Sequence, residues 1–158
     1  MRKAFIETLT ELAEKDPKVL LVVGDVGFSF LEDFKSRFPG QFLNCGIMEQ
    51  TMMGFAAGVA TKGGKPYVYT MSNFILLRPH EQLRNDICFP NLNVKLISVK
   101  GSEAYRFLGM SHNLFPGEEE AILGTLPNLT SYFPKTDAEA RQAILDSYAS
   151  EKAIYIRL

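Results

Sequence analysis

The chain is poor in cysteine, has no tryptophan and carries almost no excess charge. Its two cysteines, Cys45 and Cys88, form neither a Cys-x-x-Cys pair nor a His/Cys metal cluster. Two isolated cysteines are typical of reduced, buried side chains, so we expect no disulfide framework, no metal ligated by this chain and no thiol chemistry. The 17 basic and 18 acidic side chains are dispersed and give a net charge of −1, which argues against a nucleic-acid or anionic-membrane partner.

Long apolar runs are also missing. No segment approaches the roughly 20 apolar residues that a helix needs to cross a bilayer, and the first residues carry Glu7 within a helical pattern and lead to no cleavage-site motif. We therefore expect a cytoplasmic protein with no membrane partner. With 46% apolar content, 158 residues can bury one good core but hardly two, so the sequence predicts a single domain over residues 1–158.

Short β-branched runs alternate with segments of helical period along the whole chain. Strands are expected at 19–23, 42–44, 67–70, 94–99, 129–133 and 153–158, and helices at 3–15, 30–38, from Glu49, 77–88, 118–125 and 137–148, the last capped by Asp137. The first strand is continuously apolar, which favours cover on both of its faces. The pattern predicts a three-layer α/β/α sandwich with a mostly parallel sheet of about six strands.

Ligands of open α/β sheets bind outside the carboxyl ends of the strands, so the residues that follow each strand are the site candidates. They are Asp25 and Ser29 after the first strand, Glu49 after the second, 71–74 after the third, 100–112 after the fourth and Phe133 after the fifth. All of them are expected to line one rim.

Glu49 stands out among these candidates because it opens a helix that is apolar on nearly every side. Burial favours its neutral carboxyl form, whereas the positive end of the helix favours the carboxylate, so the group is suited to hold or share a proton. The alternative interpretation is an ordinary first-turn glutamate that satisfies backbone donors.

Several motifs then resemble one family. Gly46-Ile47-Met48-Glu49-Gln50, followed by Gly54-Phe55-Ala56-Ala57-Gly58, resembles a segment of the pyrimidine-binding domain of transketolase-like thiamine diphosphate enzymes. Further matches lie in the same order at Arg2-Lys3, Gly24-Asp25, Phe74…Arg78…Glu81-Gln82 and Pro127-Asn128-Leu129, so the resemblance covers the whole chain. Gly24-Asp25-Val26 departs from the family's magnesium-binding GDG…N motif, because its third residue is wrong and the nearest asparagine, Asn44, comes too soon.

The resemblance implies a role for each matched position. Glu49 would hydrogen-bond N1′ of the cofactor's aminopyrimidine ring and so activate it. The ring would be held by Met71, Phe74 and Leu77, of which Phe74 alone keeps the aromatic stack; core packing is the alternative, for Leu77 in particular. Among the cofactor-binding residues, Asp25 would also lie near the substrate entrance and Val26 near the cofactor, with a turn-forming aspartate as the alternative for Asp25. His112 would approach the substrate as a second catalytic residue, with an unpaired surface histidine as the alternative.

Substrate recognition is implied less directly. Arg2 and Ser29 stand where the family binds a sugar phosphate, Lys100 replaces a loop histidine, and Phe133 replaces an arginine. Phosphorylated ketose specificity is therefore not implied, and Arg78 or Arg106 offers a cation for an anion placed differently.

The family also needs a second domain that holds the diphosphate through Mg²⁺, and this chain contains only the first. The resemblance implies a separate diphosphate-binding subunit in an α2β2 assembly, with Met52, Met53, Phe55 and Leu83 as an apolar contact surface or, alternatively, as core. The implied activity is transfer of a two-carbon ketol or acyl unit from a ketose or 2-oxo acid donor to a carbonyl acceptor in carbohydrate metabolism. A split 2-oxo acid decarboxylase and a catalytically silent module are the alternatives, and a nucleotide-binding domain is the weakest because no G-x-G-x-x-G follows the first strand.

Overall fold

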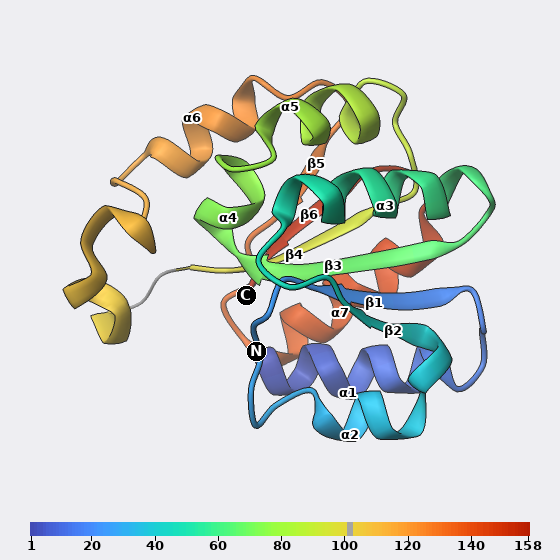
Figure 1. Cartoon of the computed structure of the whole chain (residues 1–158). Helices are drawn as coiled ribbons and strands as arrows, with labels where there is room; N and C mark the ends of the chain where they lie inside the picture. Colours follow the sequence, from blue (N-terminus) through green and yellow to red (C-terminus); the bar gives the residue numbers. More distant parts are fainter. Residues whose placement is uncertain (101–102) are drawn as a thin grey trace.

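A parallel six-stranded sheet forms the centre of the molecule (Figure 1). The computed structural model describes residues 1–100 and 103–158. The strands are β1 (Val19–Val23), β2 (Phe42–Asn44), β3 (Lys65–Met71), β4 (Lys95–Val99), β5 (Thr130–Tyr132) and β6 (Ile154–Arg157). Their order is β2-β1-β3-β4-β6-β5, and every neighbouring pair is parallel. The predicted α/β fold is confirmed.

Helices cover both faces of this sheet (Figure 1). One face carries α1 (Arg2–Ala13), α2 (Glu32–Arg37) and α7 (Asp137–Ala149), and the other carries α3 (Glu49–Thr61), α4 (Ser72–Leu76), α5 (His80–Gln82) and α6 (Glu118–Gly124). Shorter turns of helix are η1 (Pro39–Gln41), η2 (Leu83–Cys88, of π type) and η3 (Glu103–Ser111). The strands thus lie between two helical layers, as the sequence predicted.

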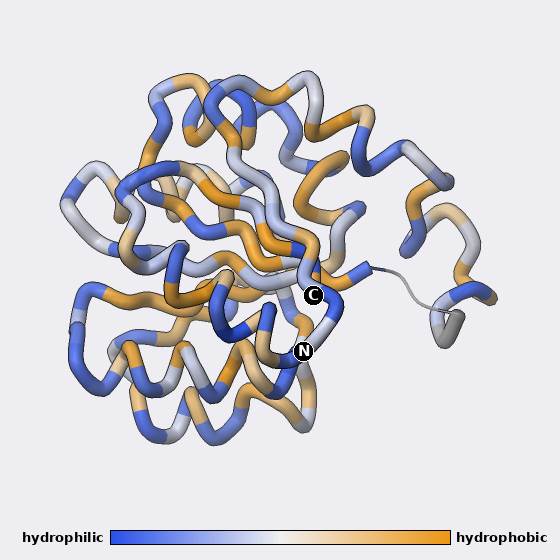
Figure 2. Tube along the Cα trace, turned by 180° about the vertical axis from the view of Figure 1, so that it is seen from behind, coloured by the Kyte–Doolittle hydropathy of each residue, from blue (hydrophilic) through white to orange (hydrophobic). Residues whose placement is uncertain are grey.

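Each face of the sheet has its own apolar core, because successive side chains of a strand point to opposite faces. On β1, Leu21 and Val23 pack with the cluster that contains Phe5 of α1, whereas Val22 packs with the cluster that contains Met52 of α3. Figure 2 shows the resulting run of apolar residues through the middle of the molecule. Burying each such side chain contributes roughly 1.5–3 kcal/mol to folding, which explains why β1 is apolar throughout.

The helix predicted at 77–88 is present but begins later, at His80. The chain enters α4 directly from β3, that helix ends at Leu76, and α5 and η2 then follow one another without interruption as far as Cys88. Pro79 lies between α4 and α5. A proline has no backbone N–H donor and its ring clashes with the preceding helical turn, so α4 cannot continue through it. The break leaves Arg78 in the link between α4 and α5.

Two further expectations are corrected. The N-cap of α7 is Thr136 rather than Asp137: the Glu139 amide donates to the Thr136 hydroxyl over 3.1 Å. The contact surface fails for three of its four residues, because Met52, Met53 and Leu83 are fully buried, in agreement with the alternative interpretation as core. Only Phe55 of that set is exposed, to 40%, on the outer side of α3.

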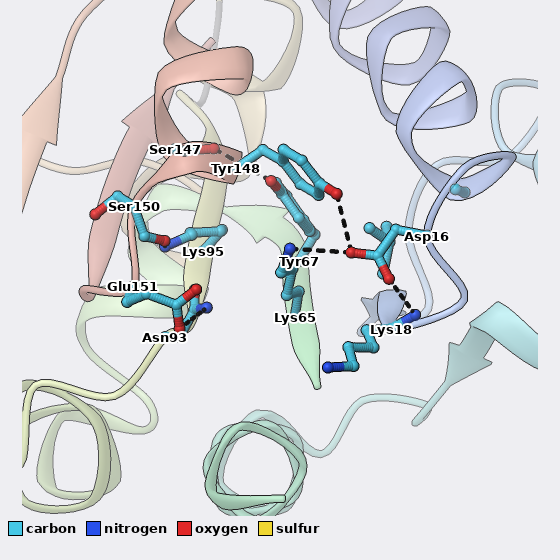
Figure 3. Close-up of polar contacts among 12 residues, drawn as sticks. Asp16, Lys18, Lys65, Tyr67, Asn93, Lys95, Ser147, Tyr148, Ser150 and Glu151 are labelled. Atoms are coloured by element: carbon cyan, nitrogen blue, oxygen red, sulfur yellow. Dashed lines mark hydrogen bonds and ion pairs between the residues drawn. The ribbon is translucent and has the colours of Figure 1, made fainter. Parts of the chain in front are cut away.

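A polar cluster lies at the end of the sheet where β3 and β4 begin (Figure 3). The Asp16 carboxylate accepts hydrogen bonds from Lys65 Nζ over 2.9 Å and from the Tyr148 hydroxyl over 3.0 Å. Lys95, only 1% exposed, donates from Nζ to the carbonyl oxygens of Ser150 over 2.9 Å and Lys152 over 2.6 Å. Burial lowers the pKa of Lys95 to about 8, although nearby Glu151 opposes the shift.

Candidate functional site

A cleft of about 420 Å³ opens at the carboxyl ends of the central strands. We call it the rim cleft; its lining residues are Arg2, Gly24, Asp25, Val26, Gly27, Phe28, Phe30, Ile47, Glu49, Met71, Phe74, Arg78, Tyr105 and His112. A second cavity of about 380 Å³, the side hollow, adjoins it and adds Met1, Tyr69, Val99, Lys100 and Leu158 to a shared wall of Arg2, Val26, Gly27, Met71 and Tyr105. The two cavities are therefore parts of one larger depression.

Glu49 lies in the wall of the rim cleft with only 4% of its surface exposed. It is the first residue of α3, and Gly46, at a φ of 72°, provides the turn that leads from β2 into that helix. Arg78 donates from Nη1 to Glu49 Oε1 over 2.6 Å, a short charge-assisted hydrogen bond. The predicted seclusion of this carboxylate is confirmed, and its partner comes from the link after α4.

Phe74 forms the aromatic surface of the same cleft. It is 6% exposed, and the Arg78 guanidinium carbon lies 3.7 Å from the centroid of its ring. The His112 ring meets Phe74 edge-on, with 5.1 Å between centroids and an interplanar angle of 69°. Glu49, Phe74, Arg78 and His112 thus form one contiguous group.

Hydrogen bonds fix the position and tautomer of His112. Asn73 of α4 donates from Nδ2 to the Ser111 carbonyl over 2.6 Å, which ties the histidine segment to α4. The Ser111 hydroxyl donates to the Leu108 carbonyl over 2.7 Å and also lies 2.7 Å from His112 Nδ1. Since a hydroxyl has one proton, Nδ1 must be the donor in the second contact, and a neutral ring then keeps its lone pair on Nε2.

The loop after β1 is held in an uncommon backbone conformation. Asp25 has a φ of 54°, and its amide donates to Asn44 Oδ1 over 3.0 Å while Asn44 Nδ2 donates to Asp25 Oδ1 over 3.2 Å. Gly27 has a φ of 89°, and a Cβ there would lie 2.5 Å from Leu31 Cδ1. Asn44, which is a mismatch to the family's metal motif, instead clamps Asp25 at the cleft. The strand-end rule could have found it, because Asn44 ends β2 beside Val23 of β1.

The side hollow is cationic and aromatic. Arg2 and Lys100 are its charged side chains, and Tyr69 and Tyr105 form its walls. Burial raises the pKa of Tyr69, while the neighbouring Arg2 guanidinium opposes that rise. No Asp or Glu side chain is found among the described residues that line the hollow, so it is suited to an anionic group.

The structure does not bring every candidate into these two cavities. Ser29, which is exposed at a φ of 59°, gives its amide to Glu32 Oε1 over 2.6 Å and lines neither cavity. Leu77 is 46% exposed and also lines neither. Phe133 follows β5 at the far edge of the sheet, where its ring centroid lies 4.7 Å from the Arg157 guanidinium carbon, so the expectation of a single rim fails there.

Sequence reasoning did not single out several lining residues. Phe28 lies in a loop without a motif to mark it, whereas Ile47 lies within the motif at 46–50 and Tyr105 within the candidate range 100–112, but neither was named as a site residue. Arg106 is exposed and lines neither cavity. Within residues 1–100 and 103–158, no group of three or more His, Cys, Asp or Glu side chains is placed to hold a metal ion. No helix in the same ranges is both long and apolar enough to span a membrane.

Comparison with known proteins decides the family. A sequence profile described as "Transketolase, pyrimidine binding domain" matches residues 1–158. The chain belongs to this family. A subunit of apulose-4-phosphate transketolase from Phocaeicola vulgatus (strain ATCC 8482 / DSM 1447 / JCM 5826 / CCUG 4940 / NBRC 14291 / NCTC 11154) is 34% identical over 99% of the chain and 50% of its own length. The 6-deoxy-6-sulfo-D-fructose transketolase subunit SqwH of Clostridium sp. (strain MSTE9) is 28% identical over 100% of the chain and 49% of its own length.

A solved structure described as "Split gene transketolase, inactive beta4 tetramer" superposes with a TM-score of 0.87 at 35% identity, over 99% of this chain and 50% of that one. The chain therefore spans about half the length of the curated relatives named above and of this solved structure.

The residues of the rim cleft fit the aminopyrimidine half of thiamine diphosphate. A buried carboxylate and an aromatic face lie together, beside the apolar side chains of Val26, Ile47 and Met71, which suits a flat ring with polar edges. The diphosphate and its Mg²⁺ find no such fit, because the described residues supply no acidic metal-ligand cluster.

Proposed function

We propose that the chain is the pyrimidine-binding subunit of a heteromeric, thiamine diphosphate-dependent transketolase-like enzyme that moves a two-carbon ketol or acyl unit, and that residues 1–158 act as one domain. The observation that carries the proposal is the buried Glu49 carboxylate in the same cleft wall as Phe74. When bound, the cofactor supplies nucleophilic carbon chemistry that protein side chains lack.

The residues of the rim cleft have different roles around the pyrimidine ring. Glu49 holds or shares a proton at ring nitrogen N1′, a role supported by its burial in the cleft wall beside Phe74. Phe74 stacks against the ring, and Val26 and Met71 exclude water from it. Asp25, held by Asn44, lies at the same wall, whereas Leu77 is assigned to the pyrimidine ring by the family resemblance alone.

The substrate is assigned to the side hollow and its border with the rim cleft. Arg2 and Lys100 bind an anionic group on a ketose donor or a carbonyl acceptor, and His112 holds or moves a proton at the substrate through Nε2. Ser29 is assigned to the sugar-phosphate end of the substrate by resemblance alone. The names of two relatives mention a sugar that bears a phosphate and a sugar that bears a sulfonate. These names support an anionic sugar as the substrate class.

The partner is a diphosphate-binding subunit that holds Mg²⁺, in an α2β2 assembly in the cytoplasm. Exposed apolar side chains border the rim cleft, where Phe28 is 76%, Ile47 69% and Met48 53% exposed, and their cover by a partner would remove this surface from water. The related split-gene transketolase is described as inactive when its β chains form a tetramer by themselves, which supports the need for a second kind of subunit.

The test is turnover and cofactor binding in the assembled enzyme. Glu49→Gln keeps the size of the side chain and removes its acid–base function, so turnover should fall about 10²–10⁴-fold while both subunits still associate. Glu120→Gln, at an exposed glutamate in the first turn of α6, is the matched control and should leave turnover unchanged. Full turnover by Glu49→Gln refutes the assignment, and an assembled complex that binds no thiamine diphosphate with Mg²⁺ supports a silent module.

A further inference from the structure

Arg78 makes both of the contacts that the proposed function assigns to the pyrimidine ring. Its Nη1 donates to Glu49 Oε1 over 2.6 Å, and the same guanidinium lies 3.7 Å from the Phe74 ring centroid. Arg84, which lies further along the chain in η2, makes neither contact and donates to Asn85 Oδ1 at the surface. The double contact is therefore a property of the Arg78 position.

A guanidinium has the shape that these two contacts require. It is planar, carries its N–H donors in the plane, and stacks with its face on aromatic rings. An aminopyrimidine is likewise planar, hydrogen-bonds at its edge and stacks through its face. Because Phe74 is only 6% exposed and also packs against His112 in a T-shaped pair, a second flat group cannot stack in the same place while Arg78 remains.

We propose that Arg78 is a stand-in for the pyrimidine ring: its guanidinium pairs with Glu49 on Phe74 in the cofactor-free chain and must leave when the cofactor binds. This inference rests on the proposed function, because it takes Glu49 and Phe74 as the pyrimidine contacts. Arg78 thereby sets the cofactor affinity of the chain as a positioning residue.

The surroundings of Arg78 allow its side chain to leave without moving the backbone. The side chain is 40% exposed, and the residue lies in the link between α4 and α5 just before Pro79. Its carbonyl oxygen accepts a hydrogen bond from Gln50 Nε2 over 3.4 Å, which ties the link to α3. A rotation of the side chain is then sufficient, and Glu49 exchanges one partner for another rather than standing buried and unpaired.

Calorimetric titration of the chain with the aminopyrimidine half of thiamine, as its free hydroxymethyl compound, tests the stand-in directly. Removing an ion pair and a cation–π contact that compete with the probe should tighten its binding about tenfold in Arg78→Ala. Arg84→Ala is the matched control and should bind like the unchanged chain. Guanidinium chloride at millimolar concentration should compete with the probe in Arg78→Ala and not in the control.

The outcomes separate the stand-in from the pyrimidine site itself. If Arg78→Ala binds the probe equally or more weakly, or if guanidinium does not compete, Arg78 is not a stand-in, although the pyrimidine site remains. If the unchanged chain and all variants fail to bind the probe, the pyrimidine assignment fails and the stand-in fails with it. Arg78→Lys keeps the charge without the plane; it replaces Arg78→Ala if thermal unfolding shows that variant misfolded, and should also bind more tightly than the unchanged chain.

Discussion

The buried ammonium of Lys95 makes the stability of this protein depend on pH in a calculable way. Burial lowers its pKa from 10.5 to about 8, so the native state loses this proton before the unfolded state does. Between these two pH values the unfolded chain binds more protons, and the free energy of unfolding therefore rises with pH. One pKa unit corresponds to about 1.4 kcal/mol, which gives a rise on the order of 2–3 kcal/mol between pH 7 and pH 10.

Other groups also titrate at alkaline pH. The effect of Lys95 must therefore be measured as a difference between the free energies of unfolding of the unchanged chain and of a variant. Burial raises the pKa of the Cys88 thiol to about 12 and also raises the pKa of Tyr67, and both shifts destabilise the fold at alkaline pH. Lys95→Met removes the ammonium and keeps a long apolar stem. Subtracting the free energy of unfolding of this variant from that of the unchanged chain cancels the contributions of Cys88 and Tyr67.

The assay is urea unfolding followed by far-UV circular dichroism, from pH 7 to pH 10 at one protein concentration. The difference should grow in favour of the unchanged chain by roughly 2–3 kcal/mol over this range. At any one pH the variant also leaves the carbonyl oxygens of Ser150 and Lys152 without their donor, which adds a constant offset and no slope. A difference that stays flat with pH would refute the argument that burial governs this lysine.

Two smaller perturbations test the hydrogen bonds around the cleft and under α6. Asn44→Ala removes the clamp on Asp25 and should lower the free energy of unfolding by about 1 kcal/mol; a double-mutant cycle with Asp25→Ala that shows no coupling would contradict it. Glu119, 3% exposed, accepts from the Tyr155 hydroxyl over 2.5 Å and from Arg157 over 2.6 Å, so Glu119→Gln should cost about 2 kcal/mol in urea unfolding, and a loss no larger than that of an exposed glutamate would contradict its role.

The bounds of an element were predicted best where its residues strongly favour one kind of secondary structure. The apolar run of β1 and the short strand β2 have the predicted bounds, because β-branched and aromatic residues bounded by turn residues leave little choice. The burial of Glu49 followed from the apolar helix that it opens. Pro79 was visible in the sequence and could have moved the start of the helix predicted at 77–88 to His80.

Other features depend on three-dimensional neighbours that periodicity does not reveal. A helix that is apolar on all sides does not show which side meets the sheet, so contact surface and core stayed open for Met52 and Met53 until the structure showed that both are core. The pairing of Arg78 with Glu49 joins residues 29 positions apart, and it arises only because α3 and the link after α4 meet at one rim. A pattern within a single segment carries no information about such a contact.

The division of the depression into a rim cleft and a side hollow separates two kinds of evolutionary change. Glu49 and Phe74 belong to the cleft alone, and Lys100 belongs to the hollow alone. A substitution at the end of β4 therefore reshapes the hollow without disturbing the group that faces the cleft. Under the proposed function, lineages can acquire new substrates through a few changes around the hollow while inheriting an intact device for cofactor activation.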